Sequence, residues 1–177
     1  PSKVFPGGFL CSNPGLPVAS GHPAQRERSA PNNRHMNISV SELIVRYLER
    51  LGIDHIFGMP GAHVLPIYDC LHDSSVKSVL VKHEQGAAFM AGGYARLSHQ
   101  PSACIATAGP GATNLVTGIA NAFAERLPVL SITGETPTYQ FGRGGLQESS
   151  GEGGTIDQAA LFASITRYRR LVERTDY

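Results

Sequence analysis

The feature that most constrains this chain is an alternation of short apolar runs with longer helical patterns. Four apolar runs lie at residues 55–57, 79–81, 102–107 and 129–133, and a helical pattern separates each from the next. Strands that alternate with helices at this spacing form βαβ units, whose strands pair in parallel. The runs show little polar alternation, which is typical of strands covered on both faces. The sequence therefore predicts an α/β fold: a doubly wound parallel sheet with helices on both faces.

The predicted helices carry recognisable ends and one interruption. Ser39-Val-Ser-Glu42 is a capping-box pattern, in which Ser39 opens a helix and Glu42 reaches back, and Gly52 ends that helix. A second helix is predicted over residues 62–71, interrupted near Pro66. The remaining expected elements are helices at 84–96, 112–123 and 156–165, a glycine-rich segment at 136–155, and either a final strand or the lead into another domain at 168–172.

Residues 1–35 are not expected to belong to this domain. They hold six of the twelve prolines and show no periodic apolar pattern, which is typical of a flexible or non-native arm. The periodic pattern begins at Met36, so one domain is predicted over residues 36–177. A transit peptide is the alternative for the arm, because three arginines face a single glutamate there, although no amphipathic pattern accompanies them.

The charge and the cysteines exclude several classes of partner. Charged residues make up 16% of the chain and the formal net charge is +1, with no basic block, so neither a nucleic acid nor a membrane is expected as a partner. No apolar run approaches the roughly 18 residues of a membrane span. The three cysteines form no Cys-x-x-Cys pair, which favours reduced thiols in a cytoplasmic protein.

Glu84 is the strongest single candidate for a functional side chain. It follows the predicted strand at 79–81 and opens an alanine- and glycine-rich helix. In open α/β sheets, ligands bind at the carboxyl ends of the strands, which is where this carboxylate is expected. The alternative is a solvated glutamate in a first helical turn, stabilised by the helix dipole, and position alone does not separate the two.

A second candidate is Gly109-Pro-Gly111 at the start of another predicted helix, where backbone amides can meet an anion. No Gly-Lys-Ser/Thr follows, so it is not a P-loop, and Asn114 stands where the third glycine of the dinucleotide fingerprint should be. Glycines after strands also occur simply to make a turn. A ligand-facing role and a turn-forming role therefore both stay open for Gly109, Pro110 and Gly111.

The other polar residues give weaker signals. The pattern at 83–87 lacks the second histidine of a zinc protease, and no other histidine shows metal-ligand spacing, so no metal site is predicted in this chain. We expect His63 and His72 at the surface. Gln147 and Glu148 lie in the long glycine-rich segment. Loops of this length often carry function, but the residues alone favour two solvated side chains.

Four motifs, taken in order and spacing, give the chain a family resemblance. They are Phe57-Gly-Met-Pro-Gly61, Lys82-His-Glu-Gln-Gly-Ala-Ala88 with Gly93-Tyr-Ala-Arg96, Ala108-Gly-Pro-Gly-Ala-Thr-Asn114, and Gly145-Leu-Gln-Glu148. With them, residues 37–177 resemble the N-terminal pyrimidine-binding domain of thiamine-diphosphate-dependent enzymes. The likeness is to the acetolactate synthase group and its carboligase and decarboxylase relatives, and it covers none of the first 35 residues.

The resemblance implies a role for each candidate residue. Glu84 would bond to N1′ of the aminopyrimidine ring of thiamine diphosphate and act as the catalytic carboxyl. The residues that would lie beside the cofactor are Pro60, Gly61, Gly109, Pro110, Gly111 and Asn114. Gln147 would face the reaction site on the substrate side. The implied activity is that of a lyase or transferase acting on a 2-oxo acid, with pyruvate as the family default.

One departure from the family limits what this chain is expected to do. The family binds the cofactor's diphosphate through Mg²⁺ on a second α/β domain marked by Gly-Asp-Gly, and no Gly-Asp-Gly occurs in this sequence. In these enzymes the cofactor also lies between two subunits of a homodimer or tetramer. The resemblance therefore implies a fragment that contributes part of a shared site and is inactive alone. FAD, a cofactor of several relatives, would bind mainly in a middle domain outside this sequence.

Two other classes of function stay open on the sequence. The chain is alternatively a stand-alone subunit that pairs with a separate diphosphate-binding chain. It is alternatively a non-catalytic interaction domain that keeps the fold and the dimer surface. A partner that restores activity would favour the first alternative, and intact dimerisation without activity would favour the second.

Overall fold

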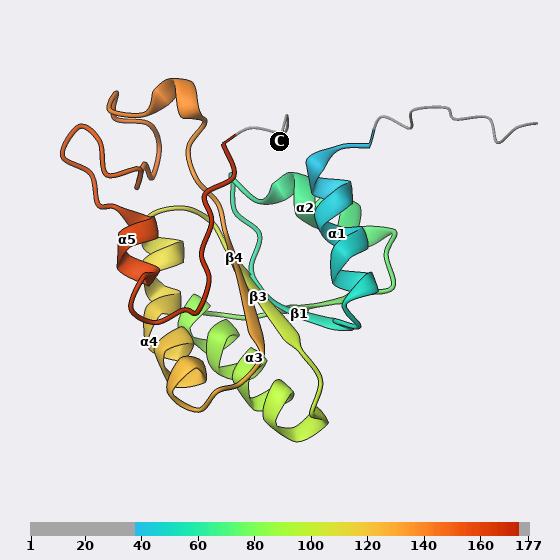
Figure 1. Cartoon of the computed structure of the whole chain (residues 1–177). Coiled ribbons are helices and arrows are strands. Elements are labelled where there is room, and N and C mark those ends of the chain that lie inside the picture. The colour runs from blue at the N-terminus through green and yellow to red at the C-terminus, as the bar shows by residue number, and fades with distance from the viewer. Residues whose placement is uncertain (1–37, 174–177) are drawn as a thin grey trace, which may run out of the picture. The chain divides into compact units, whose positions relative to one another are not determined.

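A four-stranded parallel sheet forms the centre of the computed structural model, which describes residues 38–173 (Figure 1). The strands are β1 (His55–Gly58), β2 (Lys77–Leu80), β3 (Ser102–Ala106) and β4 (Val129–Thr133), in the order β2-β1-β3-β4. Every neighbouring pair is parallel, which confirms the predicted α/β fold. The predicted N-terminal arm, residues 1–35, lies outside the described residues.

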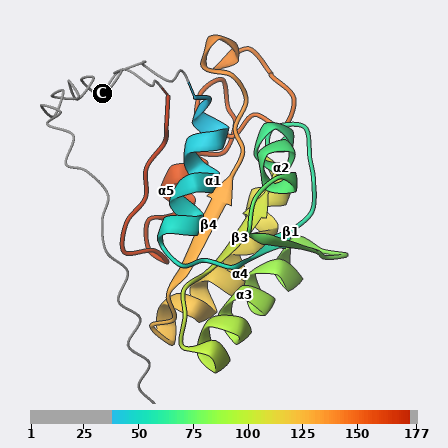
Figure 2. The ribbon, with the colours of Figure 1, turned by 90° about the vertical axis from the view of Figure 1, so that its right-hand side faces the viewer.

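Helices cover both faces of the sheet, as the doubly wound prediction requires (Figure 1, Figure 2). They are α1 (Val40–Arg50), α2 (Leu65–His72), α3 (Glu84–Ser98), α4 (Pro110–Ala124) and α5 (Gln158–Phe162), with a short 3₁₀ helix, η1 (Thr138–Gln140). One apolar core joins α3, α4 and α5 to Phe57 and Cys104 of the sheet. The other joins α1 and α2 to Ile56 and Ile105. Adjacent strand residues thus point into opposite cores, which is the two-residue period of a strand.

Helix α1 begins and ends where its sequence signals lie. The backbone N–H of Glu42 donates to Ser39 Oγ at 3.0 Å, which is the first half of the predicted capping box. The predicted second half is wrong, because the Glu42 carboxylate accepts instead from Arg46, one turn later, at 2.5 Å. Gly52 follows the helix with a φ of +72°, a conformation that favours glycine and ends the helix as predicted.

Three local predictions differ from the structure. Pro66 lies in the first turn of α2, where no intrahelical hydrogen bond is lost, so the helix begins at Leu65 and is not interrupted. The helix predicted at 156–165 is limited to the five residues of α5. Residues 168–172 form no strand and the described sheet ends at β4, so the alternative, a lead into another domain, stays a prediction.

Strand β2 is less buried than the sequence predicts. It begins at Lys77 and ends at Leu80, a residue that is 66% exposed. The reason is its edge position in the sheet, whereas β3, with a neighbour on each side, is buried at every residue.

Burial raises the pKa of the Cys104 thiol in β3 to about 12, so this thiol is neutral and unreactive. Cys70 and Cys104 are both free, as predicted.

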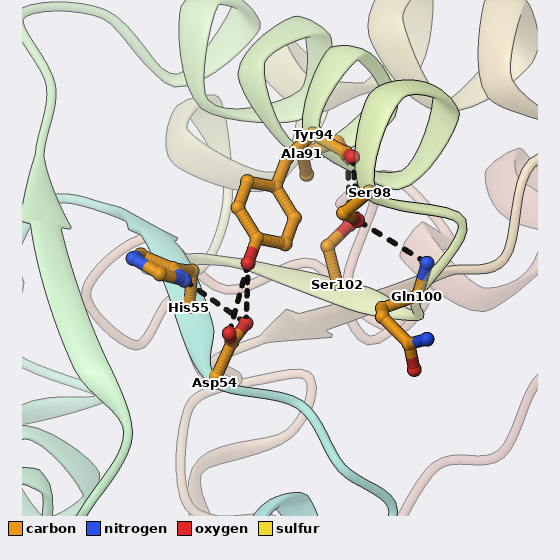
Figure 3. Close-up of polar contacts among 7 residues, drawn as sticks. All are labelled: Asp54, His55, Ala91, Tyr94, Ser98, Gln100 and Ser102. Atoms are coloured by element: carbon orange, nitrogen blue, oxygen red, sulfur yellow. Dashed lines mark hydrogen bonds and ion pairs between the residues drawn. The ribbon is translucent and has the colours of Figure 1, made fainter. Parts of the chain in front are cut away.

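A polar cluster ties α3 to the residues at the amino end of β1 (Figure 3). The Tyr94 hydroxyl contacts both carboxylate oxygens of Asp54, at 2.8 and 2.9 Å, and Nδ1 of His55 lies 2.9 Å from Asp54 Oδ1. Nearby, the buried Ser102 hydroxyl donates to the Ala91 carbonyl at 2.7 Å. These contacts fix the position of α3 along β1 and β3.

The Asp54 carboxylate makes stability depend on acid pH. Hydrogen bonds from His55 and Tyr94 hold the pKa of Asp54 below its usual value. A depressed carboxyl pKa stabilises the fold above the unfolded-state pKa of ~3.9, and this contribution is lost as the pH falls through the folded-state pKa. Between about pH 6 and about pH 3, the free energy of unfolding, measured by urea denaturation, should therefore fall less for Tyr94→Phe than for the wild type. Tyr47→Phe, on the exposed face of α1, is the control, and equal losses in all three proteins would contradict the assignment.

Candidate functional site

The loops after β1 and β3 meet at the carboxyl edge of the sheet. The two strands are neighbours, but the chain leaves them in opposite directions, from β1 toward β2 and from β3 toward β4. Such a reversal is the switch point at which ligands bind in open α/β sheets. Here a Cβ on Gly61 would lie 2.5 Å from the Cβ of Thr107. The two loops therefore pack together with no room for a side chain at position 61.

Glu84 reaches this edge from the first residue of α3. His83 caps the helix, because the N–H of Gln85 donates to its Nδ1 at 3.2 Å. Oε2 of Glu84 accepts from Nδ2 of Asn114 at 3.0 Å. A Cβ on Gly111 would lie 3.6 Å from the other carboxylate oxygen, Oε1. The structure thus brings together Glu84, Gly111 and Asn114, three of the predicted site residues.

The Glu84 carboxylate keeps one oxygen for a ligand. The residue is half-buried, and within residues 38–173 only Oε2 has a hydrogen-bond partner. Oε1 can therefore accept a hydrogen bond from a ligand, or share a proton with it. The alternative of a simply solvated Glu84 does not explain why its carboxylate accepts a hydrogen bond from Asn114. That residue lies 30 positions further along the chain.

Close packing of α3 against α4 sets the distance between Glu84 and Asn114. Gly118 of α4 faces Ala88 of α3, and a Cβ on Gly118 would lie 2.4 Å from the Cβ of Ala88. The buried residues of both helices include several alanines and glycines, which let the two backbones approach. The small buried residues of α3, Ala88 among them, therefore let α4 pack closely against this helix.

Gly109 packs against the glycine-rich loop and has two reasons to be a glycine. Its φ of +58° favours glycine, and a Cβ would lie 3.0 Å from the carbonyl oxygen of Gln147. Its N–H donates to Ser149 Oγ at 3.3 Å. The turn-forming role of Gly109 is therefore confirmed, and a ligand-facing role for it and for Pro110 stays a prediction.

Thr107 links two further side chains at this edge. Its hydroxyl donates to Oε1 of Gln147 at 3.3 Å, and its Oγ1 lies 3.0 Å from Nδ1 of His63. His63, predicted at the surface, is only partly exposed. His63 is half-buried because it packs against Gly134, where a Cβ would lie 2.5 Å from the Cβ of His63. His72 is exposed, as predicted.

The glycine-rich segment folds around Glu148. Its buried carboxylate accepts from the backbone N–H groups of Gly142, Gly144 and Gly145 and from the hydroxyl of Ser150. These bonds, the one from Gly142 above all, hold the pKa of the Glu148 carboxyl below its usual value. The solvated alternative is therefore wrong for Glu148, which shapes the loop from inside.

A second network fixes the same loop to the end of β4. The hydroxyl of Ser149 lies 3.0 Å from Oε2 of Glu135 and 3.1 Å from Oε1 of Gln158. The Gln158 amide in turn donates to the Gly134 carbonyl at 3.2 Å. This anchoring carries Gln147 to the switch point, although Gln147 lies far from β1 and β3 in the sequence.

The predicted site residues fall into two groups at one edge of the sheet. The first contains Glu84, Gly111 and Asn114, and the second contains Gly61, Gly109 and Gln147. Pro60 is exposed in the loop after β1, and Pro110 opens α4. Thr107 and His63, which join the second group, were not predicted. The sequence signal for Thr107 is its position: it is the polar residue that directly follows β3, a strand that is buried at every residue.

The part of the chain that the structure describes holds no group of three or more histidine, cysteine, aspartate or glutamate side chains suited to a metal ion. Nor is any helix within residues 38–173 long and apolar enough to cross a membrane.

A cavity of about 690 Å³ lies away from the switch point, between α5 and residues 166–173. Cavity volume therefore does not locate the site, whereas the polar chemistry at the carboxyl edge does.

A family model and several relatives match this chain. Residues 38–161 match the model described as thiamine pyrophosphate enzyme, N-terminal TPP binding domain. Over 136 residues the chain is 43% identical to a probable acetolactate synthase large subunit of Methanocaldococcus jannaschii, covering 77% of this chain and 22% of that protein. It is 40% identical over 137 residues to the acetolactate synthase isozyme 1 large subunit of Escherichia coli, covering 77% and 23%. It is 39% identical over 146 residues to the probable 2-ketoarginine decarboxylase AruI of Pseudomonas aeruginosa, covering 81% and 25%.

These relatives are much longer than the region they share with this chain. The chain spans between 22% and 25% of their length, so the shared region is one domain of a larger protein in each of them. The family match covers most of the described residues, and it includes the switch point, Glu84 and Asn114. On this match and this fold, the chain belongs to the thiamine pyrophosphate enzymes and contains their N-terminal cofactor-binding domain.

Proposed function

We propose that this chain is the pyrimidine-binding domain of a thiamine-diphosphate-dependent 2-oxo-acid carboligase or decarboxylase similar to acetolactate synthase. The observation that carries the proposal is the pair formed by Glu84 and Asn114, 3.0 Å apart at the switch point of the sheet. The relatives support the substrate class, since two are named acetolactate synthase large subunits and one a 2-ketoarginine decarboxylase.

The residues at the switch point fit an aminopyrimidine ring. Such a ring offers a basic nitrogen, N1′, and Glu84 offers an oxygen that has no partner among the described residues. A carboxyl group and a ring nitrogen of this kind can share one proton in a short, charge-assisted hydrogen bond. A Cβ on Gly111 would lie 2.7 Å from the methyl group of Thr107, so glycine lets the start of α4 pack closely beside Glu84 and Thr107. Pro60, Gly61 and Gly109 would lie beside the same cofactor.

Glu84 is the catalytic residue of this proposal. Thiamine diphosphate, when bound, supplies a thiazolium ring that takes up the electron pair released as a 2-oxo acid loses carbon dioxide. Glu84 holds a proton at N1′, and Asn114 keeps the carboxyl group directed by holding Oε2. Gln147 lies on the substrate side, where its amide can bind an oxygen of the 2-oxo acid.

The proposed enzyme needs a second α/β domain, which would hold the diphosphate through Mg²⁺. This sequence contains no Gly-Asp-Gly, so we place that domain in the rest of a longer protein, whose partner subunit in a homodimer or tetramer would contribute it to the shared site. We expect this chain to be inactive alone. The free thiols of Cys70 and Cys104 support a cytoplasmic location. FAD, if the enzyme uses it, would bind mainly in a middle domain.

Turnover by the longer protein that contains this chain tests the proposal. With thiamine diphosphate and Mg²⁺, that protein is expected to consume pyruvate and form acetolactate, and this chain at the same concentration is expected to form none. Carbon dioxide release without a new carbon–carbon bond would favour the decarboxylase branch. Activity only after addition of a separate diphosphate-binding chain would favour a two-chain enzyme. No cofactor-dependent consumption of any 2-oxo acid would contradict the proposal and favour a non-catalytic interaction domain.

A further inference from the structure

Thr107 has one hydroxyl proton and two polar neighbours that compete for it. The hydroxyl donates to Oε1 of Gln147 at 3.3 Å, and Nδ1 of His63 lies 3.0 Å from the same hydroxyl oxygen. A hydroxyl group donates only one hydrogen bond. With its proton directed at Gln147, the other contact requires His63 Nδ1 to be the donor. The neutral His63 ring is then the Nδ1–H tautomer, which is the minor form of an unconstrained histidine.

The same proton sets the orientation of the Gln147 amide. With Oε1 turned toward Thr107, the amino group Nε2 is free of Thr107, and within residues 38–173 it has no hydrogen-bond partner. If His63 carried its proton on Nε2, its Nδ1 would take the Thr107 proton, and Gln147 would have to turn its amino group toward Thr107. The tautomer of His63 and the polarity that Gln147 presents are therefore coupled through one oxygen atom.

The backbone holds these three residues in place. A Cβ on Gly61 would lie 2.5 Å from Thr107, and a Cβ on Gly134 would lie 2.5 Å from His63, so both side chains rest directly against a neighbouring backbone. Gln147 has a φ of +54°, a left-handed conformation that residues other than glycine and asparagine rarely adopt. A glutamine thus stands here against the backbone preference, which is typical of functional positions.

We propose that His63 and Thr107 are positioning residues that direct the amino group of Gln147 toward the 2-oxo acid. The amino group offers two N–H donors, so the ligand atom it recognises is an acceptor, the carboxylate or keto oxygen of the substrate. The identity of the substrate rests on the proposed function. The direction of the hydrogen bonds, from His63 to Thr107 and from Thr107 to Gln147, does not rest on the proposed function.

The tautomer of His63 tests the direction of these hydrogen bonds. It can be measured in this chain alone, with no cofactor and no activity assay. Long-range ¹H–¹⁵N spectra of the histidine side chains separate the two neutral tautomers when recorded about two units above the ordinary histidine pKa. We expect His63 in the Nδ1–H form, and the exposed His72 in the same spectra in the usual Nε2–H form. His63 in the Nε2–H form would overturn the inference.

Two pairs of variants separate positioning from packing. Gln147→Leu releases the Thr107 proton, so we expect His63 to change to the Nε2–H form, whereas Gln147→Glu keeps an oxygen acceptor and the Nδ1–H form. Thr107→Ser keeps the hydroxyl and should behave as the wild type, whereas Thr107→Val should lose the Nδ1–H preference. Backbone amide spectra check that each variant is folded. An unchanged His63 tautomer in folded Gln147→Leu or Thr107→Val would overturn the inference.

In the longer enzyme the same contacts are expected to act on substrate binding. His63→Leu should raise KM for the 2-oxo acid by roughly 10- to 100-fold with little change in kcat, as expected for a lost hydrogen bond to a charged group. His63→Asn, whose amide can donate to Thr107, should bring KM back near the wild-type value. A fall in kcat at unchanged KM would overturn the positioning role. An inactive wild type would instead refute the proposed function. The tautomer of His63 would still decide the direction of the hydrogen bonds among the three side chains.

Discussion

In the longer enzyme, Glu84→Gln is expected to lower kcat on a 2-oxo acid by roughly 10²- to 10⁴-fold, the range for loss of a positioned proton-transfer group. Glutamine has nearly the shape of glutamate, and its amide oxygen can accept the hydrogen bond that Asn114 donates to Glu84 at 3.0 Å. The fold and the Asn114 contact are therefore expected to remain. What glutamine lacks is an acidic proton that it can transfer to N1′ of the aminopyrimidine. Steady-state kinetics at saturating thiamine diphosphate and Mg²⁺ measures the change.

Glu42→Gln is the matched control for this substitution. Glu42 also lies in the first turn of a helix, but its carboxylate pairs with Arg46 on the exposed surface of α1. Exposed pairs of this kind contribute about 0–1 kcal/mol, so both kcat and stability should stay near those of the wild type. If kcat of Glu84→Gln also stayed within about threefold of the wild type, Glu84 would have no part in the proton transfer.

Gly118→Ala is expected to have the largest effect on stability among single-methyl changes at the interface of α3 and α4. The new Cβ would lie 2.4 Å from the Cβ of Ala88 and 3.1 Å from the Ala88 carbonyl carbon, so the two helices must separate. Overpacking of this kind costs about 1–3 kcal/mol, and the better helix propensity of alanine offsets about 1 kcal/mol of it. We expect a net loss of up to about 2 kcal/mol in the free energy of unfolding, measured by urea denaturation.

Gly93→Ala separates this clash from helix propensity. Gly93 lies inside α3 and is exposed, and a Cβ there would meet no atom within 4 Å. The same glycine-to-alanine change should therefore stabilise the chain by about 0.5–1 kcal/mol. Equal effects of Gly118→Ala and Gly93→Ala would show that the two helices do not need the close approach seen at Gly118.

The elements that the sequence predicted well are those whose causes are local. Ser39 caps α1 through the amide of Glu42, three residues away, and Gly52 ends the helix through its own backbone conformation. The edge position of β2 has no local cause. It follows from which strands pair with β1, and a run of three apolar residues at 79–81 carries no information about that.

The same distinction applies to the site. Glu84 was predicted because a strand that ends at a small-residue helix is a local pattern, and the family motif around it is continuous. The half-buried position of His63 was not predicted, because its neighbours Thr107 and Gly134 are distant in the sequence, the first of them 44 positions away. Thr107 and Gln147 are a further 40 positions apart. Only the parallel order of β1 and β3, with the loop anchored to β4, brings these three side chains together.

Exchange of the C2 proton of bound thiamine diphosphate tests the central claim most directly, because it reports cofactor activation before any 2-oxo acid binds. In deuterated solvent with Mg²⁺, the longer enzyme should exchange this proton much faster than free cofactor does. Glu84→Gln should slow the bound exchange by roughly 10²- to 10⁴-fold, and Glu42→Gln should leave it unchanged. Exchange in Glu84→Gln at the wild-type rate would contradict the role of Glu84 and, with it, the function proposed for this domain.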